Sequence, residues 1–144
     1  MEKMRVRKRY VALGLLMVAI VSLVVVGSIQ GTQQRELMDR SFLTLGRLPD
    51  AVAVYKLHED RKIVETYVTP HSADEIRAYY DQRLHEMNWQ GPGPEWTDGD
   101  LAMRCYGDPT GKVIAKLGTR SVPLTGSFDY SIEMNRNGCN PGAQ

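Results

Sequence analysis

Residues 71–89 read HSADEIRAYYDQRLHEMNW and carry the strongest local structural signal in this chain of 144 residues. Ser72 is followed three residues later by Glu75, which is the spacing of a helix capping box. An apolar residue then recurs every three or four positions, at Ile76, Tyr80, Leu84 and Met87. This spacing places the apolar side chains on one side of a helix. The sequence therefore predicts an amphipathic helix that begins at Ser72 and buries one face.

The segments on either side of this helix are typical of β-strands. Residues 51–57, AVAVYKL, and residues 62–68, KIVETYV, are rich in β-branched and aromatic side chains and are joined by the polar insert HEDR. Two such runs around a short polar insert predict a β-hairpin. After the helix, the prolines and glycines of residues 90–100 predict a loop, because they do not continue a helix.

Three more strand-like runs follow, and each alternates between apolar and other side chains. The apolar sets are Leu101, Met103 and Cys105 in the first run, Val113, Ala115 and Leu117 in the second, and Phe128, Tyr130, Ile132 and Met134 in the third. One buried and one wet face is the pattern of an antiparallel sheet that is covered on a single side. We therefore predict a two-layer α+β domain with about five antiparallel strands, in the order β-β-α-β-β-β, and one helix on one face.

The helix resembles a pattern seen in many small bacterial extracytoplasmic domains that are anchored by a membrane helix or a lipid. In those domains a Ser-led helix carries an aromatic-Tyr pair, a Leu four residues later and a closing Gly-Trp. Tyr79-Tyr80, Leu84 and Trp89 match this pattern, while Asn88 stands where glycine is usual. The resemblance covers about half of the chain and implies the α+β fold and the compartment. It implies no catalytic residue, because the matched residues are core and capping residues.

Tyr10–Ile29 is an apolar run without charge, and its 20 residues would span roughly 30 Å as a helix, the thickness of a bilayer core. Five basic residues precede it, at Lys3, Arg5, Arg7, Lys8 and Arg9. The positive-inside rule then keeps the N-terminus in the cytoplasm and exports the rest. A cleavable export signal is the alternative, with Val26-Gly27-Ser28 at the cut. The run is longer than the roughly 7–15 residues of such signals.

We therefore divide the chain into a cytoplasmic tail (1–9), a transmembrane helix (10–29), a connector (30–48) and an extracytoplasmic domain (49–144). The connector carries an apolar stripe at Leu37, Met38, Phe42 and Leu45. Either the membrane helix continues through it or a second helix follows, and the stripe packs on its own domain or on a partner helix. The formal charge is +1 overall and +4 for residues 1–9, which leaves −3 for the rest. Such a domain has no electrostatic footprint for nucleic acid, and the basic tail suits contact with lipid headgroups.

The two cysteines, Cys105 and Cys139, both lie in the part that we expect to be exported. An oxidising compartment favours a disulfide between them, with two unpaired thiols as the alternative. No C-x-x-C motif supports a catalytic redox pair. His58, His71 and His85 lack ligand-like spacing with either cysteine, so we predict no metal site and no cofactor.

The sequence offers no catalytic motif such as G-x-S-x-G or H-E-x-x-H. Ser72 is explained by helix capping, His58 by a polar turn and the Asp98–Asp100 segment by a turn without the flanking ligands of a calcium loop. We therefore predict that the protein is not an enzyme and that it acts by binding.

Two residues are candidate contacts for a partner. Trp96 lies among prolines and glycines and either contacts a partner or folds back on the core. Tyr79 flanks the apolar stripe of the helix. These features indicate an interaction or accessory module of a cell-envelope complex at the cytoplasmic membrane, with a protein partner. A sensor for lipid, glycan or peptide is the alternative and would need a pocket lined by Tyr79, Tyr80, Trp89 or Trp96. An exported hydrolase is the third possibility and would need one of the histidines beside a serine or carboxylate.

Overall fold

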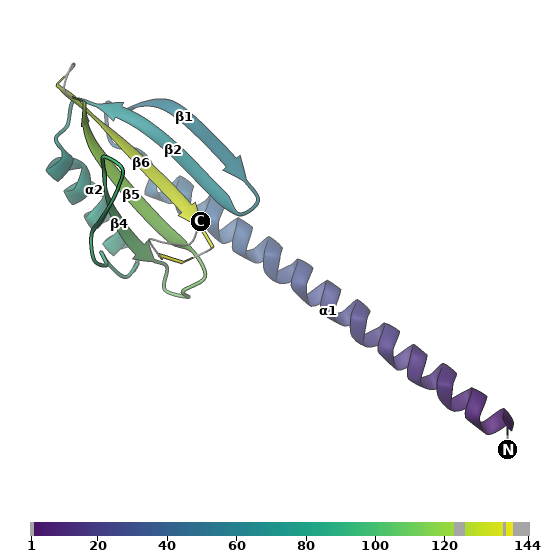
Figure 1. Ribbon diagram of the computed structural model, residues 1–144. Coiled ribbons are helices and arrows are strands. Elements are labelled where there is room, and N and C mark those ends of the chain that lie inside the picture. The colour runs from purple at the N-terminus through teal and green to yellow at the C-terminus, as the bar shows by residue number, and fades with distance from the viewer. Residues whose placement is uncertain (1, 123–125, 137, 140–144) are drawn as a thin grey trace. The chain divides into compact units, whose positions relative to one another are not determined.

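The computed structural model describes the backbone of residues 2–122, 126–136 and 138–139, with side chains from residue 14 onward. The chain divides into two compact units, with the boundary in sequence between Gln34 and Arg35. The first is helical, and the second contains the end of the same helix, a sheet and a second helix, α2 (Figure 1).

The first helix, α1, runs without a break over Glu2–Leu45. Its described part, Gly14–Leu45, contains an 18-residue window with a mean hydropathy of 2.2, none of which is buried within the protein. An apolar helix of this length fits a single-pass membrane anchor. The structure also shows that the helix continues through the segment expected as a connector, because residues 30–45 hold no proline and no helix-ending turn.

The last turns of α1 belong to the core of the second unit. Met38 and Leu45 are 0% and 1% exposed, and Leu37 and Phe42 pack against the same core. The interpretation that this stripe packs on its own domain is therefore confirmed. The compact unit begins at Arg35, earlier than the expected start at residue 49, because these side chains complete its core.

The sheet has six antiparallel strands in the order β1-β2-β6-β5-β4-β3. The strands are β1 (Val52–Glu59), β2 (Lys62–Thr69), β3 (Trp96–Asp98), β4 (Leu101–Gly107), β5 (Ile114–Val122) and β6 (Ser127–Asn135). The predicted α+β fold is confirmed, with one strand more than expected. The extra strand is β3, which lies in the segment predicted to be a loop. It pairs with β4 over only three residues, too few to show an alternating pattern in sequence.

The helix predicted at Ser72 is present as α2, which spans Ala73–Glu86. The capping box is formed: the Glu75 carboxylate accepts from the Ser72 backbone N–H at 2.8 Å, and the Ser72 hydroxyl accepts from the Glu75 backbone N–H at 3.3 Å. Ile76, Tyr80 and Leu84 are buried against one face of the sheet, here called the covered face.

The opposite face, here called the open face, carries no helix in the part of the chain that the structure describes. Tyr106 belongs to the core beneath α2, whereas Met103 and Cys105 of the same strand do not. The set Leu101, Met103 and Cys105 thus shares one face as predicted, but that face is the open one. Its packing is close: a Cβ on Gly118 would lie 2.7 Å from Met103 Sδ. The apolar side chains of β4 therefore occupy both faces of the sheet, and Cys105 on the open face is bonded to Cys139.

Candidate functional site

Strand β1 forms one edge of the sheet, and no described strand pairs with its outer side. The other edge is β3, which has three residues against eight in β1. An unpaired edge presents a row of backbone donors and acceptors that can accept a strand from another protein. The long edge at β1 is therefore the first candidate for an interaction site.

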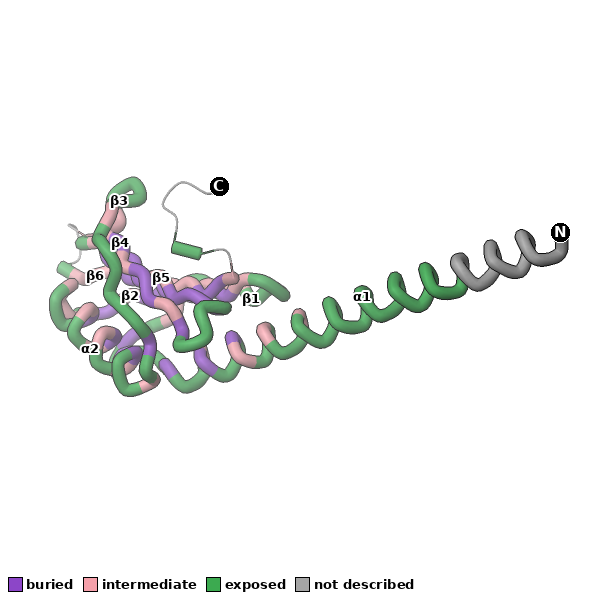
Figure 2. Tube along the Cα trace, turned by 90° about the horizontal axis from the view of Figure 1, so that it is seen from below, coloured by how far each residue is buried: buried purple, intermediate pink, exposed green. Residues whose placement is uncertain are grey.

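The side chains of β1 are unusually apolar for an exposed strand. Val52, Val54 and Tyr55 are 64%, 59% and 51% exposed, and Figure 2 colours most of β1 as exposed. The pairing with β2 is irregular between Ala53 and Tyr55, so Val54 is an extra residue in the ladder. After this bulge the pairing is regular from Tyr55 to Glu59.

On the open face, β1 and β2 together form an apolar surface. The register places Val52 opposite Val68, Tyr55 opposite Thr66 and Leu57 opposite Val64. We call this set of side chains the β1–β2 patch. Opposed pairs on one face of a sheet lie in contact, so the patch is continuous across the two strands.

A polar band borders the patch along the neighbouring strands. Glu133 of β6 binds Lys62 with a separation of 3.1 Å, and Asp129 of β6 binds Arg120 with a separation of 2.7 Å. Lys116 of β5 extends this band, with its Nζ atom 3.7 Å from Glu133 Oε1. An apolar area with a polar rim is the arrangement expected of a protein-binding surface.

On the covered side of the same hairpin, the Glu65 carboxylate is buried, with 4% of the residue exposed. It lies 2.8 Å from His58 Nε2 and 3.4 Å from Lys56 Nζ, and the Tyr67 hydroxyl donates a hydrogen bond to it. Burial raises the pKa of the Glu65 carboxyl, but the hydrogen bonds from Tyr67 and His58 and the charge of Lys56 outweigh it. The net pKa therefore lies below its ordinary value, and Glu65 stays ionised at neutral pH.

The neighbouring aromatic rings explain why this carboxylate is enclosed. The Tyr67 ring stacks on Tyr130 with centroids 5.0 Å apart, and the Phe42 ring of α1 meets the His58 ring edge-on at 5.8 Å. Burial and the bond to Glu65 raise the pKa of the Tyr67 hydroxyl above its ordinary value. Tyr67 is therefore a hydrogen-bond donor and not a proton acceptor at any ordinary pH.

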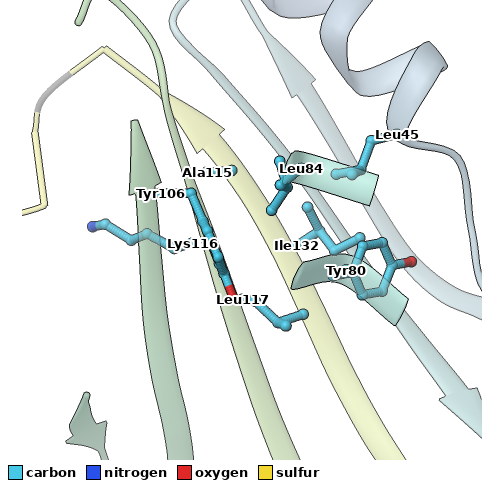
Figure 3. Close-up of a pocket in the computed structure, with 8 residues that line it drawn as sticks. All are labelled: Leu45, Tyr80, Leu84, Tyr106, Ala115, Lys116, Leu117 and Ile132. Atoms are coloured by element: carbon cyan, nitrogen blue, oxygen red, sulfur yellow. The ribbon is translucent and has the colours of Figure 1, made fainter. Parts of the chain in front are cut away.

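Histidine–carboxylate contacts exist at two places. His58 is bonded to Glu65 as described, and His71 Nδ1 lies 3.9 Å from Glu75 Oε1. The hydrolase possibility also requires a cavity beside such a pair. The cavity beneath α2 holds about 10 Å³, is lined largely by apolar side chains and includes no histidine (Figure 3). A volume of this size is about that of one water-sized probe, so it does not admit a substrate.

The aromatic residues named from the sequence serve mainly as core. Tyr80 and Trp89 are 1% and 6% exposed. Tyr79 packs edge-on against Tyr80 and donates a hydrogen bond to the Arg47 carbonyl at 3.1 Å. Trp96 is half-buried on β3, opposite Met103. Tyr79, Tyr80 and Trp89 belong to the core or pack against it, whereas Trp96 lies on the open face with Met103, so the sheet separates Trp96 from the other three rings.

Cys105 and Cys139 are at disulfide distance, with Cα atoms 5.9 Å apart, and form the expected bond. The bond ties the segment after β6 to β4 on the open face. Among the described residues, no group of three or more histidine, cysteine or carboxylate side chains is arranged to hold a metal ion. The side chains of Lys3, Arg5, Arg7, Lys8 and Arg9 lie outside the described residues.

Comparison of the chain with protein-family models, with curated proteins and with solved structures finds no match. The geometry of β1 and its surroundings is therefore what bears on function. Sequence reasoning missed the Glu65 cluster, although a signal was present. In KIVETYV the glutamate occupies the same side of the strand as Ile63 and Tyr67, and a carboxylate at an inward position needs partners.

Proposed function

We propose that this protein is a single-pass, membrane-anchored interaction module that binds a protein partner in the cell envelope through the outer edge of β1. The observation that carries the proposal is the exposure of Val52, Val54 and Tyr55 on a long edge strand. Apolar side chains on an unpaired edge are a liability that soluble domains usually avoid. Their presence favours a bound partner.

The orientation of the anchor is part of the proposal. The basic residues before Tyr10 favour an N-terminus in the cytoplasm, which would leave the domain on the outer side of the cytoplasmic membrane. The bond between Cys105 and Cys139 supports this compartment, because disulfides persist outside the cytoplasm. The resemblance of the α2 segment to anchored bacterial domains points to the same side.

A binding role, without catalysis, agrees with the packing of the domain. The cavity beneath α2 is too small for a substrate, and the buried Glu65 carboxylate is already bonded to Tyr67 and His58. Strand addition needs no pocket, because backbone hydrogen bonds supply the affinity and alternate side chains supply the specificity.

A photo-crosslinking amino acid at position 55 in the full-length protein tests the proposal in native membranes. We expect a defined crosslinked protein product from position 55. The matched control carries the same amino acid at position 86, an exposed site on α2, and should give no such product. Position 55 yielding no protein adduct would refute the proposal. Reporter fusions at Gln144 and Met1 test the orientation separately and should report opposite sides of the membrane.

A further inference from the structure

Among the described residues, the sheet has one long edge, β1, and one short edge, β3. Strand β3 pairs over three residues and is preceded by the Gly91–Pro94 segment, and proline cannot donate to a further strand. A protein with a single competent edge can join a copy of itself only edge to edge, which closes as a two-fold dimer and does not grow into a fibre. We infer that the partner of β1 is β1 of a second copy of this chain, paired antiparallel about Leu57; this inference rests on the proposed function of the edge.

The bulge in β1 determines the register. Pairing with β2 shifts register between Ala53 and Tyr55 and is regular over the longer run from Tyr55 to Glu59, so these five residues form the longest uninterrupted part of the edge. In an antiparallel pair, the side chains of two opposed residues point to the same face of the sheet. In a strand paired with its own copy, the two opposed residue numbers must therefore be both odd or both even. A strand paired with its own copy therefore has a residue on the two-fold axis. Leu57 is the centre of the regular part and meets Leu57 of the second copy.

The side chains agree with this register. On the open face, the two Leu57 side chains join the β1–β2 patches of both copies into one apolar surface. Tyr55 then lies opposite Glu59 of the second copy, where a phenol can donate a hydrogen bond to a carboxylate. A register centred on Lys56 would instead place two ammonium groups in contact, which is unfavourable.

The covered face also has the counter-charge that the register needs. About Leu57, Lys56 of one copy lies opposite His58 of the other. Each copy brings a buried Glu65 carboxylate that already lies 3.4 Å from its own Lys56 and 2.8 Å from its own His58. The Lys56 ammonium of each copy therefore meets the His58 ring of the other copy with a Glu65 carboxylate close to both, which supplies its counter-charge.

The membrane supplies the concentration that so small an interface requires. Five residue pairs bury far less than the roughly 1,000 Å² of a stable soluble interface. Anchoring by α1 confines the copies to a surface and raises their effective concentration, so weak contacts become populated. The dimer should therefore form in membranes.

A cysteine-crosslinking experiment on the full-length protein in native membranes tests the inference. The two native cysteines are bonded to each other, so Leu57→Cys introduces one reactive thiol per chain. In the pairing proposed, the two position-57 Cα atoms lie about 4.5–5.5 Å apart, within the range that a disulfide bridges. A mild oxidant removes two electrons and two protons from the thiol pair, and a covalent dimer should appear as the main species on a non-reducing gel.

Val64→Cys is the matched control, because Val64 lies directly opposite Leu57 on β2. In the dimer the two position-64 Cα atoms are about 14 Å apart, three strand spacings, and cannot be bridged. Crosslinking of Leu57→Cys and not of Val64→Cys supports the inference, whereas equal crosslinking of both would indicate collision and overturn it. If the Leu57→Cys variant stays monomeric while the photo-crosslinker at position 55 captures a different protein, the inference of a second copy is wrong and the proposed function stands. If neither position captures protein, both fail.

Discussion

Arg83 of α2 donates a hydrogen bond to the carbonyl of Thr44, in the last turn of α1, at 2.6 Å. The same guanidinium reaches the Leu45 carbonyl at 3.4 Å, and the Tyr80 hydroxyl reaches the Gly46 carbonyl at 3.4 Å. The last carbonyls of a helix have no partner within the helix and carry partial negative charge. The second helix supplies both the donors and the positive charge, so the end of α1 is built into the domain.

Removal of this cap should loosen the domain. Arg83→Ala leaves the end of α1 without a charged donor, and hydrogen bonds from charged groups contribute about 1.5–3 kcal/mol. We expect a loss in that range or slightly below it, measured by thermal or denaturant unfolding of the detergent-solubilised protein. Arg61→Ala, at an exposed site in the hairpin turn, is the control and should change the free energy of unfolding by less than about 0.5 kcal/mol. Equal effects of the two variants would contradict the capping role.

The core contribution of α1 can be measured with a second matched pair. Met38 is fully buried and Leu43 is 81% exposed on the same helix. Met38→Ala should lower the free energy of unfolding by about 2–5 kcal/mol, because it removes buried methylene groups and leaves a cavity. Leu43→Ala should have little effect on the same unfolding curve. Loss of stability only in Leu43→Ala would show that the helix packs through another face.

The Glu65 cluster makes the stability of the domain depend on acid. The folded-state pKa of Glu65 is below its ordinary value of 4.5, so its contribution is present above that pH and is lost as the pH falls through the folded-state pKa. Glu65→Gln should lower stability at neutral pH, by about 1–3 kcal/mol for loss of a charged, buried acceptor. The variant should also lose less stability than the wild type between pH 6 and pH 3, as a flatter unfolding profile. Glu36→Gln, an exposed site on α1, should reproduce the wild-type profile.

The disulfide should be complete and stabilising. Thiol labelling of the unfolded, unreduced protein should find no reactive cysteine. The bond closes a loop with a sequence separation of 34 residues. By restricting the unfolded chain, a loop of this length should stabilise the folded state by about 3–4 kcal/mol. A variant with Cys105→Ser and Cys139→Ser should therefore lose about 3–4 kcal/mol of unfolding free energy and unfold at a lower temperature. Labelling of both cysteines in the wild type would contradict the bond.

Much of the fold was accessible from local patterns. The Ser72–Glu75 capping box, the apolar stripe of α2 and the hairpin of β1 and β2 each depend on residues close together in sequence. Their spacing therefore carries the signal directly. Strand β3 was not predicted, because three residues are too few to show the alternation of apolar and polar side chains. Its pairing with Met103 also depends on the turn at residues 98–100.

The sequence by itself determined that an apolar helix precedes a small α+β domain with one helix beside an antiparallel sheet. Only the tertiary structure decided that β1 is the long edge, that Met103 and Cys105 face away from α2, and that Glu65 gathers Lys56, His58 and Tyr67. The reason is physical: strand order and sheet face arise from pairings between segments far apart in the chain, and no local period records which strand is left without a neighbour.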